Sequence, residues 1–195
     1  DAKLLLEHLG IKGKIIVNGA SFGASLALLF AETYPELIKH IIVSSVFLMR
    51  PEDAGWVTHM SRIFYPDFID PMREMAHSKD IVSYFHKLIF SKKGSDIKKA
   101  QKYYGTYEMQ LGKLSPTWAN DPDLTEETIR STRIYLHYEK NKFFVGSDEI
   151  LGHIKRIQKI PTLIVHNRLD FCCPVVGAYE LHQKLPKSKL VIVPS

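Results

Sequence analysis

A Gly-x-Ser-x-Gly pentapeptide, residues 19–23, lies between a strand pattern and a helix pattern. Residues 14–18 (KIIVN) form a short β-branched run that is apolar on both faces, which predicts a buried parallel strand. The helical pattern of residues 22–34 stops at Pro35, because proline cannot continue a helix. A strand, a tight turn and a helix in this order predict an α/β fold.

Ser21 is the predicted nucleophile at the centre of this turn. A serine at such a turn has a strained backbone, and its oxygen projects from the C-terminal edge of the sheet. We expect glycine to be needed at Gly19 and Gly23, because a Cβ at either position would collide with the neighbouring strand and helix. The following helix directs N–H groups at the site, so the backbone N–H of Phe22 is the predicted oxyanion donor. The alternative is a glycine-rich turn without chemistry.

The rest of the sequence divides into three zones. Further strands are predicted at residues 41–45, 162–166 and 190–193, and a helix at residues 175–185. This βαβ pattern predicts a parallel sheet with right-handed crossovers. The middle of the chain has no strand signal and is helical and rich in aromatic residues. We therefore predict a core made of residues 1–50 and 147–195, with residues 51–146 inserted as a helical cap.

Composition excludes several classes of protein. A chain of 195 residues with 45% hydrophobic and 24% charged residues can bury a core without a metal or disulfide. The net charge of +5 comes from 26 Lys and Arg interleaved with 21 acids, which favours a solvated surface over nucleic-acid binding. The longest apolar run, residues 41–49, is too short to span a membrane. Cys172 and Cys173 are adjacent and poorly placed for a disulfide, which favours a reducing, cytoplasmic location.

No metal or cofactor is predicted. The sequence lacks H-E-x-x-H, C-x-x-C and a phosphate-binding Gly-Lys-Ser. The acidic group around residues 121–127 is interpreted as capping a helix through Thr125.

Asp170 is the predicted acid of a catalytic triad. A nucleophilic serine needs a base, and the base needs a carboxylate that orients it. In strand–turn–helix hydrolases the chain order is serine, acid, histidine, and Asp170 follows the strand predicted at residues 162–166. The alternative is a turn aspartate that caps residues 167–168.

The catalytic histidine is missing from this chain. Of the nine histidines only His182 follows Asp170, and it lies on a predicted amphipathic helix. His166 precedes the acid and is interpreted as a neighbour of the site at most. The sequence also opens inside a helix pattern and stops after a strand pattern, so we expect it to be part of a longer protein.

The sequence resembles the proline iminopeptidases, peptidases of the α/β-hydrolase fold, over nearly its whole length. Residues 19–28 (GASFGASLAL) resemble the family's G-G-S-W-G-S-T-L-A-L, and residues 45–50 (SVFLMR) resemble G-I-F-L-L-R. Residues 160–174 (IPTLIVHNRLDFCCP) resemble I-P-T-x-I-V-x-G-R-Y-D-x-V-C-P. Residues 104–108 echo a cap motif W-x-x-W-E, and residues 138–143 loosely echo I-E-N-H-Y-F. The resemblance implies a parallel sheet flanked by helices with a helical cap, and it independently selects Asp170.

The resemblance implies release of an N-terminal proline from a small peptide. Ser21 would attack the proline carbonyl, and Asp170 would orient a histidine that lies outside this chain together with the upstream oxyanion loop. Glu108 and Glu139 match the glutamates that bind the free ammonium of the substrate. No cofactor, nucleic acid or membrane partner is implied, and no oligomeric state is assigned.

Three further residues take roles from the same resemblance. Tyr104 and Tyr107 would form an aromatic wall for the flat pyrrolidine ring. Cys173 matches the family's cysteine beside the acid, and it is either reactive or a packed, inert thiol.

Two other functions remain open. The first is an esterase or amidase of the same fold that acts on uncharged acyl groups, in which Glu108 and Glu139 would be exposed helix residues. The second is a hydrolase-fold protein that has lost catalysis and serves as a binding module. If the glutamates converge on Ser21, a substrate with a free amine is favoured over the esterase or amidase. A histidine soon after Ser195 would favour an active hydrolase over a binding module.

Overall fold

The computed structural model describes residues 1–77, 80–113, 115–118 and 121–194. It divides into two compact units. We call the first, Asp1–Arg50 with Ser147–Ser195, the sheet unit, and the second, Pro51–Gly146, the helical unit.

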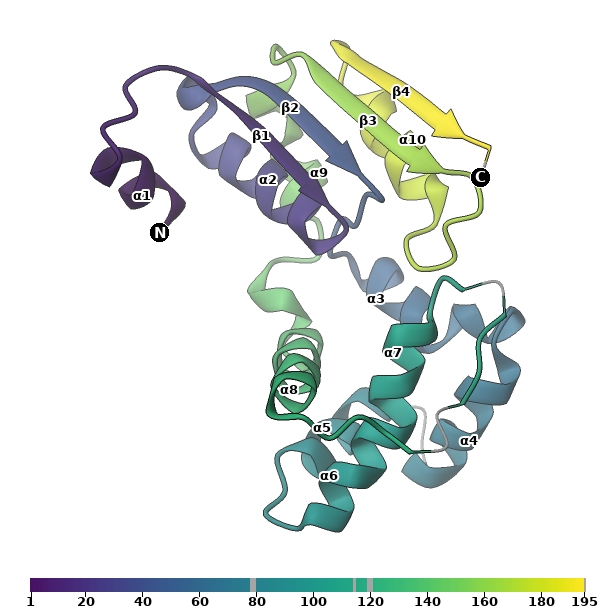
Figure 1. Ribbon diagram of the computed structural model, residues 1–195. Coiled ribbons are helices and arrows are strands. Elements are labelled where there is room, and N and C mark those ends of the chain that lie inside the picture. Colours follow the sequence, from purple (N-terminus) through teal and green to yellow (C-terminus); the bar gives the residue numbers. More distant parts are fainter. Residues whose placement is uncertain (78–79, 114, 119–120, 195) are drawn as a thin grey trace. The chain divides into compact units, whose positions relative to one another are not determined.

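The sheet unit is built on four parallel strands in the order β1-β2-β3-β4 (Figure 1). Their bounds are Ile15–Ala20, Ile38–Ser44, Thr162–Asn167 and Ser188–Val193. The register aligns Gly19 with Val43 and Val43 with Ile164, so the ends of β1, β2 and β3 lie at one edge of the sheet. The predicted α/β fold with a parallel sheet is confirmed.

Helices pack on this sheet and close a single core. They are α2 (Phe22–Thr33), α9 (Glu149–His153), η5 (Ile154–Ile157) and α10 (Val175–Lys184), and η1 (Pro35–Leu37) connects α2 to β2. The first helix, α1 (Ala2–His8), precedes β1 and buries none of its residues. One apolar cluster joins α2, β2, β3 and α10 through Leu28, Ile41, Ile164 and Leu181, all of which are fully buried. A continuous cluster of this kind holds the strands in register, since a one-residue slip would turn each apolar side chain to the opposite face.

The prediction that the first strand is buried on both faces is wrong. Burial alternates along β1, and the Ile16 side chain is 55% exposed. The physical reason is that, among the described residues, β1 pairs with β2 alone and α2, α9 and α10 lie on one face of the sheet (Figure 1). Its apolar residues therefore meet the core on one side only.

The helical unit contains no strand among its described residues. Its elements are α3 (Pro51–Thr58), η2 (Met60–Ile63), α4 (Pro66–Ala76), α5 (Ile81–Ile89), α6 (Gly94–Ala100), the π-helical turn η3 (Gln101–Gly105), α7 (Thr106–Gln110), α8 (Glu126–Lys140) and η4 (Lys142–Phe144). The unit has its own aromatic centre, in which Phe68, Phe85, Tyr104 and Tyr107 are at most 1% exposed. None of the helices in the described part of the chain has both the length and the hydrophobicity to cross a membrane.

The helix start predicted at Thr125 is confirmed. Thr125 is the N-cap of α8, and its hydroxyl accepts a hydrogen bond from the backbone N–H of Thr128 at 3.3 Å. Asp123 supports the cap by accepting from the Thr125 N–H at 2.8 Å. These contacts satisfy N–H groups that the first turn of a helix leaves without an intrahelical acceptor.

Candidate active site

Ser21 forms the turn between β1 and α2 in a conformation that L-residues rarely adopt. Its φ is 53° and its ψ is −125°. A non-glycine residue in such a region costs on the order of 1–3 kcal/mol, so the surroundings must hold it there. Two backbone hydrogen bonds do so, one from the Ser21 N–H to the Ser44 carbonyl at 3.1 Å and one from the Ala24 N–H to the Ser21 carbonyl at 2.9 Å. The side chain is exposed at the end of β1, where a nucleophile can be reached.

The two glycines that flank Ser21 are not equivalent. A Cβ at Gly19 would lie 2.1 Å from the Gly23 carbonyl oxygen and 2.9 Å from the Ala24 nitrogen, so only glycine fits. A Cβ at Gly23 would meet nothing within 4 Å among the described residues. The prediction that both glycines are needed is therefore wrong for Gly23. The close approach comes from α2 packing against β1 at Gly19.

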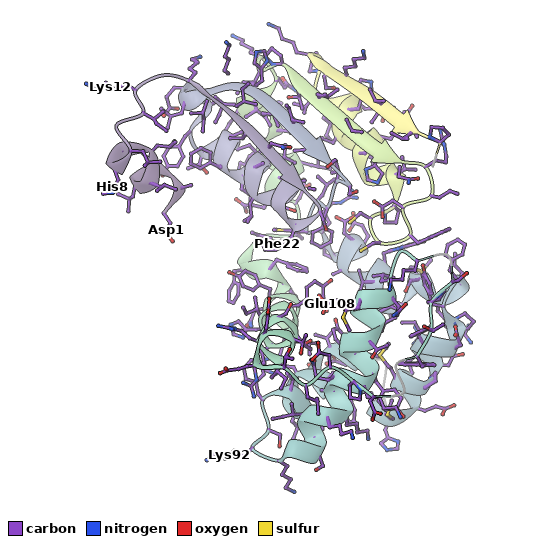
Figure 2. All side chains as sticks on the ribbon, in the orientation of Figure 1. Asp1, His8, Lys12, Phe22, Lys92 and Glu108 are labelled. Carbon is purple, nitrogen blue, oxygen red and sulfur yellow. The ribbon has the colours of Figure 1, made fainter. Side chains whose placement is uncertain are left out.

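Phe22 is the first residue of α2, directly after Ser21 (Figure 2). Its backbone N–H belongs to the first turn, whose N–H groups point out of the N-terminal end of the helix and carry a partial positive charge. This position is compatible with the predicted oxyanion role.

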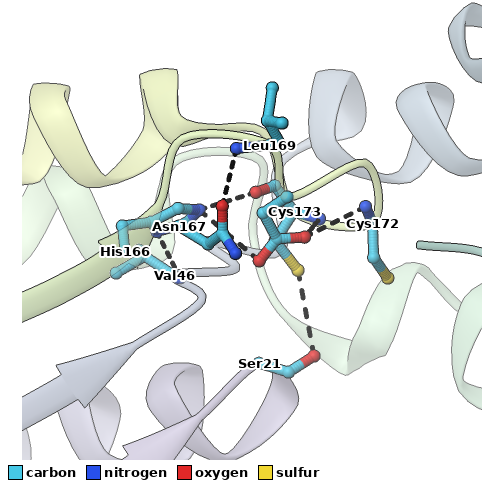
Figure 3. Close-up of polar contacts among 8 residues, drawn as sticks. Ser21, Val46, His166, Asn167, Leu169, Cys172 and Cys173 are labelled. Atoms are coloured by element: carbon cyan, nitrogen blue, oxygen red, sulfur yellow. Dashed lines mark hydrogen bonds and ion pairs between the residues drawn. The ribbon is translucent and has the colours of Figure 1, made fainter. Parts of the chain in front are cut away.

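Asp170 lies in the loop that follows β3, and this loop fixes its carboxylate. Oδ1 accepts hydrogen bonds from the backbone N–H groups of Cys172 at 3.0 Å and Cys173 at 2.8 Å (Figure 3). The side chain of Asp170 is 12% exposed. The carboxylate does not cap residues 167–168, because the N–H groups that it accepts belong to residues that follow Asp170 in the chain. Asn167 caps that turn instead, accepting from the Leu169 N–H at 2.8 Å.

Cys173 connects the turn at Ser21, which we call the serine turn, with the loop after β3 that carries Asp170, which we call the acid loop. Its Sγ lies 3.8 Å from the Ser21 Oγ, although the two residues are 152 positions apart in sequence (Figure 3). The hydrogen bond with Cys172, and then burial, raise the pKa of the Cys173 thiol far above its ordinary value. Cys173 therefore stays a neutral thiol, which favours the packed, inert alternative.

His166 cross-links this corner of the sheet unit. Its Nδ1 accepts from the Val46 N–H at 3.1 Å, so the ring is neutral and its proton is on Nε2. Nε2 donates to the Cys173 carbonyl at 2.7 Å and lies 3.7 Å from the Asp170 Oδ2. A ring with both nitrogens occupied cannot act as the base, and it instead positions the acid loop. Its place at the end of a strand was visible in the sequence, but its contact with Val46 was not.

His182 does not supply the missing base either. It lies on α10, and its Nδ1 is 2.7 Å from the Ser188 hydroxyl. This contact joins α10 to the start of β4.

The segment that carries Val46 is itself held by contacts that sequence reasoning missed. The buried Ser25 hydroxyl donates to the Phe47 carbonyl. Arg50 donates from Nη1 to Glu180 Oε2 at 2.5 Å, and the Arg50 side chain is largely buried. These bonds fix the exit from β2 against α2 and α10, and so fix the acceptor geometry at His166.

Glu108 is a partly buried and Glu139 a buried carboxyl group of the helical unit. Burial raises the pKa of Glu108, which lies on α7 (Figure 2), to about 7. Glu139 lies on α8 and is 7% exposed. Burial also raises the pKa of Glu139 to about 7, the charges of Glu108 and Asp80 add to the rise, and the hydrogen bond from Tyr104 opposes it. Two carboxyl groups with pKa values of about 7 in one unit can bind a cation, because a nearby positive charge stabilises their ionised forms.

The tyrosines of the cap motif lie inside the helical unit. Tyr104 and Tyr107 are each 1% exposed. The Tyr104 hydroxyl donates to Glu139, and the Tyr107 hydroxyl lies 2.5 Å from the Val57 carbonyl and 2.7 Å from the Ser61 hydroxyl. These contacts give both rings a packing role, and the aromatic wall for a substrate stays a prediction without support from them.

A pocket of about 280 Å³ opens between η3, α7 and α8 of the helical unit. Its lining residues come from all three elements and are Gln101, Gly105, Glu108, Met109, Thr128, Ser131 and Thr132. Glu108 is the carboxylate of this set, and Glu139 is not part of it. No group of three or more metal-ligating side chains occurs among the described residues.

Comparison with known proteins gives a consistent picture. The sequence profile of a family described as the alpha/beta hydrolase fold matches residues 1–195. The proline iminopeptidase of Neisseria gonorrhoeae is 33% identical over 99% of this chain, and that of Arabidopsis thaliana is 30% identical over 99%. The chain spans 63% and 53% of the length of these relatives, respectively.

Solved structures agree on the fold. VinJ superposes with a TM-score of 0.57 at 16% identity, covering 98% of this chain and 62% of VinJ. An alpha/beta fold family hydrolase from Bacillus anthracis gives a TM-score of 0.56 at 20% identity, covering 98% of this chain and 63% of that protein.

Proposed function

This chain belongs to the alpha/beta hydrolase fold family, and we propose that it is part of a serine hydrolase that releases the N-terminal proline from peptides. One observation carries the hydrolase part of the proposal. Ser21, in a strained turn at the end of β1, lies against Cys173 of the loop that holds Asp170 at the end of β3. The similarity to proline iminopeptidases supports the choice of substrate.

The proposed acylation begins at Ser21. Its Oγ attacks the carbonyl carbon of the N-terminal proline and gives its proton to a histidine outside this chain. Asp170 orients that histidine through Oδ2, because Oδ1 already accepts two backbone N–H groups. The Phe22 N–H stabilises the oxyanion of the tetrahedral intermediate. The C–N bond then breaks, the histidine protonates the leaving amine, and water hydrolyses the prolyl ester.

Selectivity for a free N-terminus comes from Glu108 and Glu139 in this proposal. A secondary ammonium is attracted to ionised carboxylates in a partly buried site, whereas an acylated N-terminus carries no charge there. Since the pKa of each carboxyl is about 7, cation binding strengthens as the pH rises through neutrality.

The test of the nucleophile uses the complete protein that contains this chain. A fluorophosphonate should add one adduct at Ser21, seen by intact-mass spectrometry and peptide mapping, and Ser21→Ala should abolish both labelling and turnover of a prolyl anilide. Folding should be unchanged, because the side chain is small and exposed. Ser147→Ala, which changes another exposed serine, is the matched control. Retained turnover in Ser21→Ala would overturn the proposal.

The test of substrate class uses Glu108→Gln. This variant should impair hydrolysis of substrates with a free amine about 10-fold or more while sparing small neutral esters, because only the amine needs the charge. An equal loss on both substrates would make Glu108 structural and favour the esterase alternative.

A further inference from the structure

The pocket between η3, α7 and α8 contains a hydrogen-bond acceptor without a donor. Gln101 is 3% exposed, and its Oε1 accepts no hydrogen bond from any described residue. An unsatisfied buried amide oxygen costs about 1–3 kcal/mol, so native structures rarely keep one. An acceptor of this kind, on a residue that lines a cavity, indicates a ligand with a donor to offer.

The orientation of the Gln101 amide is fixed by its other atom. Nε2 donates to the Asp123 backbone carbonyl at 3.2 Å, and only the NH₂ end of the amide can make that bond. Oε1 is therefore the end of the amide that has no partner among the described residues.

Gly105 makes the room for this oxygen. A Cβ at Gly105 would lie 2.8 Å from Gln101 Oε1 and 3.3 Å from the Thr132 hydroxyl. Gln101 and Gly105 lie on a π-helical turn, which has more residues per turn than an α-helix and stacks these two positions on one face. Glu108 continues that face by one turn, so Gln101 and Glu108 line the same pocket.

We propose that Gln101 is a specificity-determining residue that, together with Glu108, binds a secondary ammonium group in this pocket, each residue accepting one of its two N–H bonds. A secondary ammonium has two N–H donors and one positive charge, which matches one neutral acceptor and one carboxylate. Glu139 contributes its charge from outside the lining, with its carboxylate engaged by Tyr104.

Other ligand classes fit the lining less well. Calcium takes six to eight oxygen ligands, commonly with several carboxylates, whereas Glu108 is the one carboxylate here. A neutral amide or alcohol could donate to Gln101 but would leave the partly buried Glu108 carboxylate without a counter-charge when it is ionised. That the bound amine is the substrate's N-terminus rests on the proposed function. The binding of a secondary ammonium itself involves only residues of the helical unit.

The first experiment varies the ligand and leaves the protein unchanged. Pyrrolidinium, N-methylpyrrolidinium and N,N-dimethylpyrrolidinium carry the same charge and have two, one and no N–H donors. We expect their affinities for the 195-residue chain to fall about 10-fold at each methylation at about pH 8, where Glu108 is ionised. Binding is followed by NMR shifts of the Gln101 side-chain amide and the Gly105 N–H. Equal affinities for the three cations, or no binding of pyrrolidinium, would overturn the proposal.

The second experiment removes the acceptor. Gln101→Leu should bind pyrrolidinium about 10-fold more weakly than the unchanged chain does. This variant should bind N-methylpyrrolidinium as tightly as pyrrolidinium, because Glu108 alone remains as an acceptor and needs only one N–H donor. Gln110→Leu, a change at the end of α7 outside the pocket lining, is the matched control and should behave as the unchanged chain. An unchanged methylation series in Gln101→Leu overturns the role of Gln101. If that variant does not fold, the ligand series on the unchanged chain decides.

These outcomes are separable from those of the proposed function. Binding is read in the helical unit without turnover, and fluorophosphonate labelling is read at Ser21 of the sheet unit. A chain that binds the cations as expected and is never labelled at Ser21 would keep this inference and lose the hydrolase. The reverse result would keep the hydrolase and lose Gln101.

Discussion

Single residues in the sheet unit show how closely the serine turn is constrained. Ser21 holds a positive φ that costs free energy, and hydrogen bonds involving Ser44 and Ala24 hold it there. Gly19 permits the close approach of α2, because its missing Cβ would overlap the Gly23 carbonyl. The strain is local, but the atoms that maintain it come from β1, β2 and α2.

The two glycines of the turn should therefore respond differently to alanine. Gly19→Ala should lower the free energy of unfolding of the chain by about 3 kcal/mol or more, since a backbone overlap cannot be relieved by a rotamer change. Gly23 lies in α2, and a Cβ added there would meet nothing within 4 Å among the described residues. Gly23→Ala should therefore lower the free energy of unfolding by no more than about 1 kcal/mol, or raise it, because alanine favours the helix. Urea denaturation followed by circular dichroism measures both. Equal losses in the two variants would contradict the asymmetry.

Among the helices, α7 carries a partly buried and α8 a buried carboxyl group, and the ionisation of these groups opposes folding. Glu139 is held near Tyr104, Glu108 and Asp80, and burial raises its pKa from 4.5 to about 7. Below about pH 4.5 the carboxyl is protonated in both the folded and the unfolded chain. Between that pH and about 7 the folded state binds the proton more tightly, so stability falls as the pH rises. The same groups that destabilise the helices provide the charge for a cation.

Removing one of these carboxyls should flatten the pH dependence. Glu139→Gln keeps an acceptor for the Tyr104 hydroxyl but cannot ionise. The unchanged chain should lose on the order of 2 kcal/mol more stability than the variant between about pH 5 and pH 8. Tryptophan fluorescence during urea unfolding measures the free energy of unfolding at each pH, because the two tryptophans, Trp56 and Trp118, both lie in the helical unit. Glu127→Gln on the exposed side of α8 is the control, and parallel profiles for Glu139→Gln and the unchanged chain would contradict the expectation.

At the scale of the whole molecule, the chain builds two separate cores. The apolar cluster of the sheet unit draws on both ends of the sequence, from Ala24 to Leu185. The helical unit is one continuous segment, and Phe68, Phe85 and Leu136 at its centre are fully buried. Burial of large side chains among residues of one segment provides the free energy that a folding unit needs.

The helical unit should consequently fold by itself. Residues 51–146 expressed alone should give a helical circular dichroism spectrum and a cooperative thermal transition. The ring of Trp118 stacks on Phe68 at 4.1 Å between ring centroids, so its fluorescence reports on the core during that transition. A random-coil spectrum would show that the segment depends on the sheet unit. Phe68→Ala, which removes the ring beneath Trp118, should lower the midpoint if the core is native.

The amino-acid sequence alone determined the order of strands and helices, the turn at Ser21 and the loop that bears Asp170. These features depend on hydrophobic periodicity and on short motifs, which are local properties of the chain. The remaining features of the site are visible only in the folded chain, because they depend on contacts between residues far apart in sequence. The thiol of Cys173 meets Ser21 across 152 positions, His166 gains its tautomer from Val46, and the glycines at 19 and 23 differ only through the packing of α2. The unpartnered oxygen of Gln101 is likewise defined by the carbonyl that holds the other end of its amide.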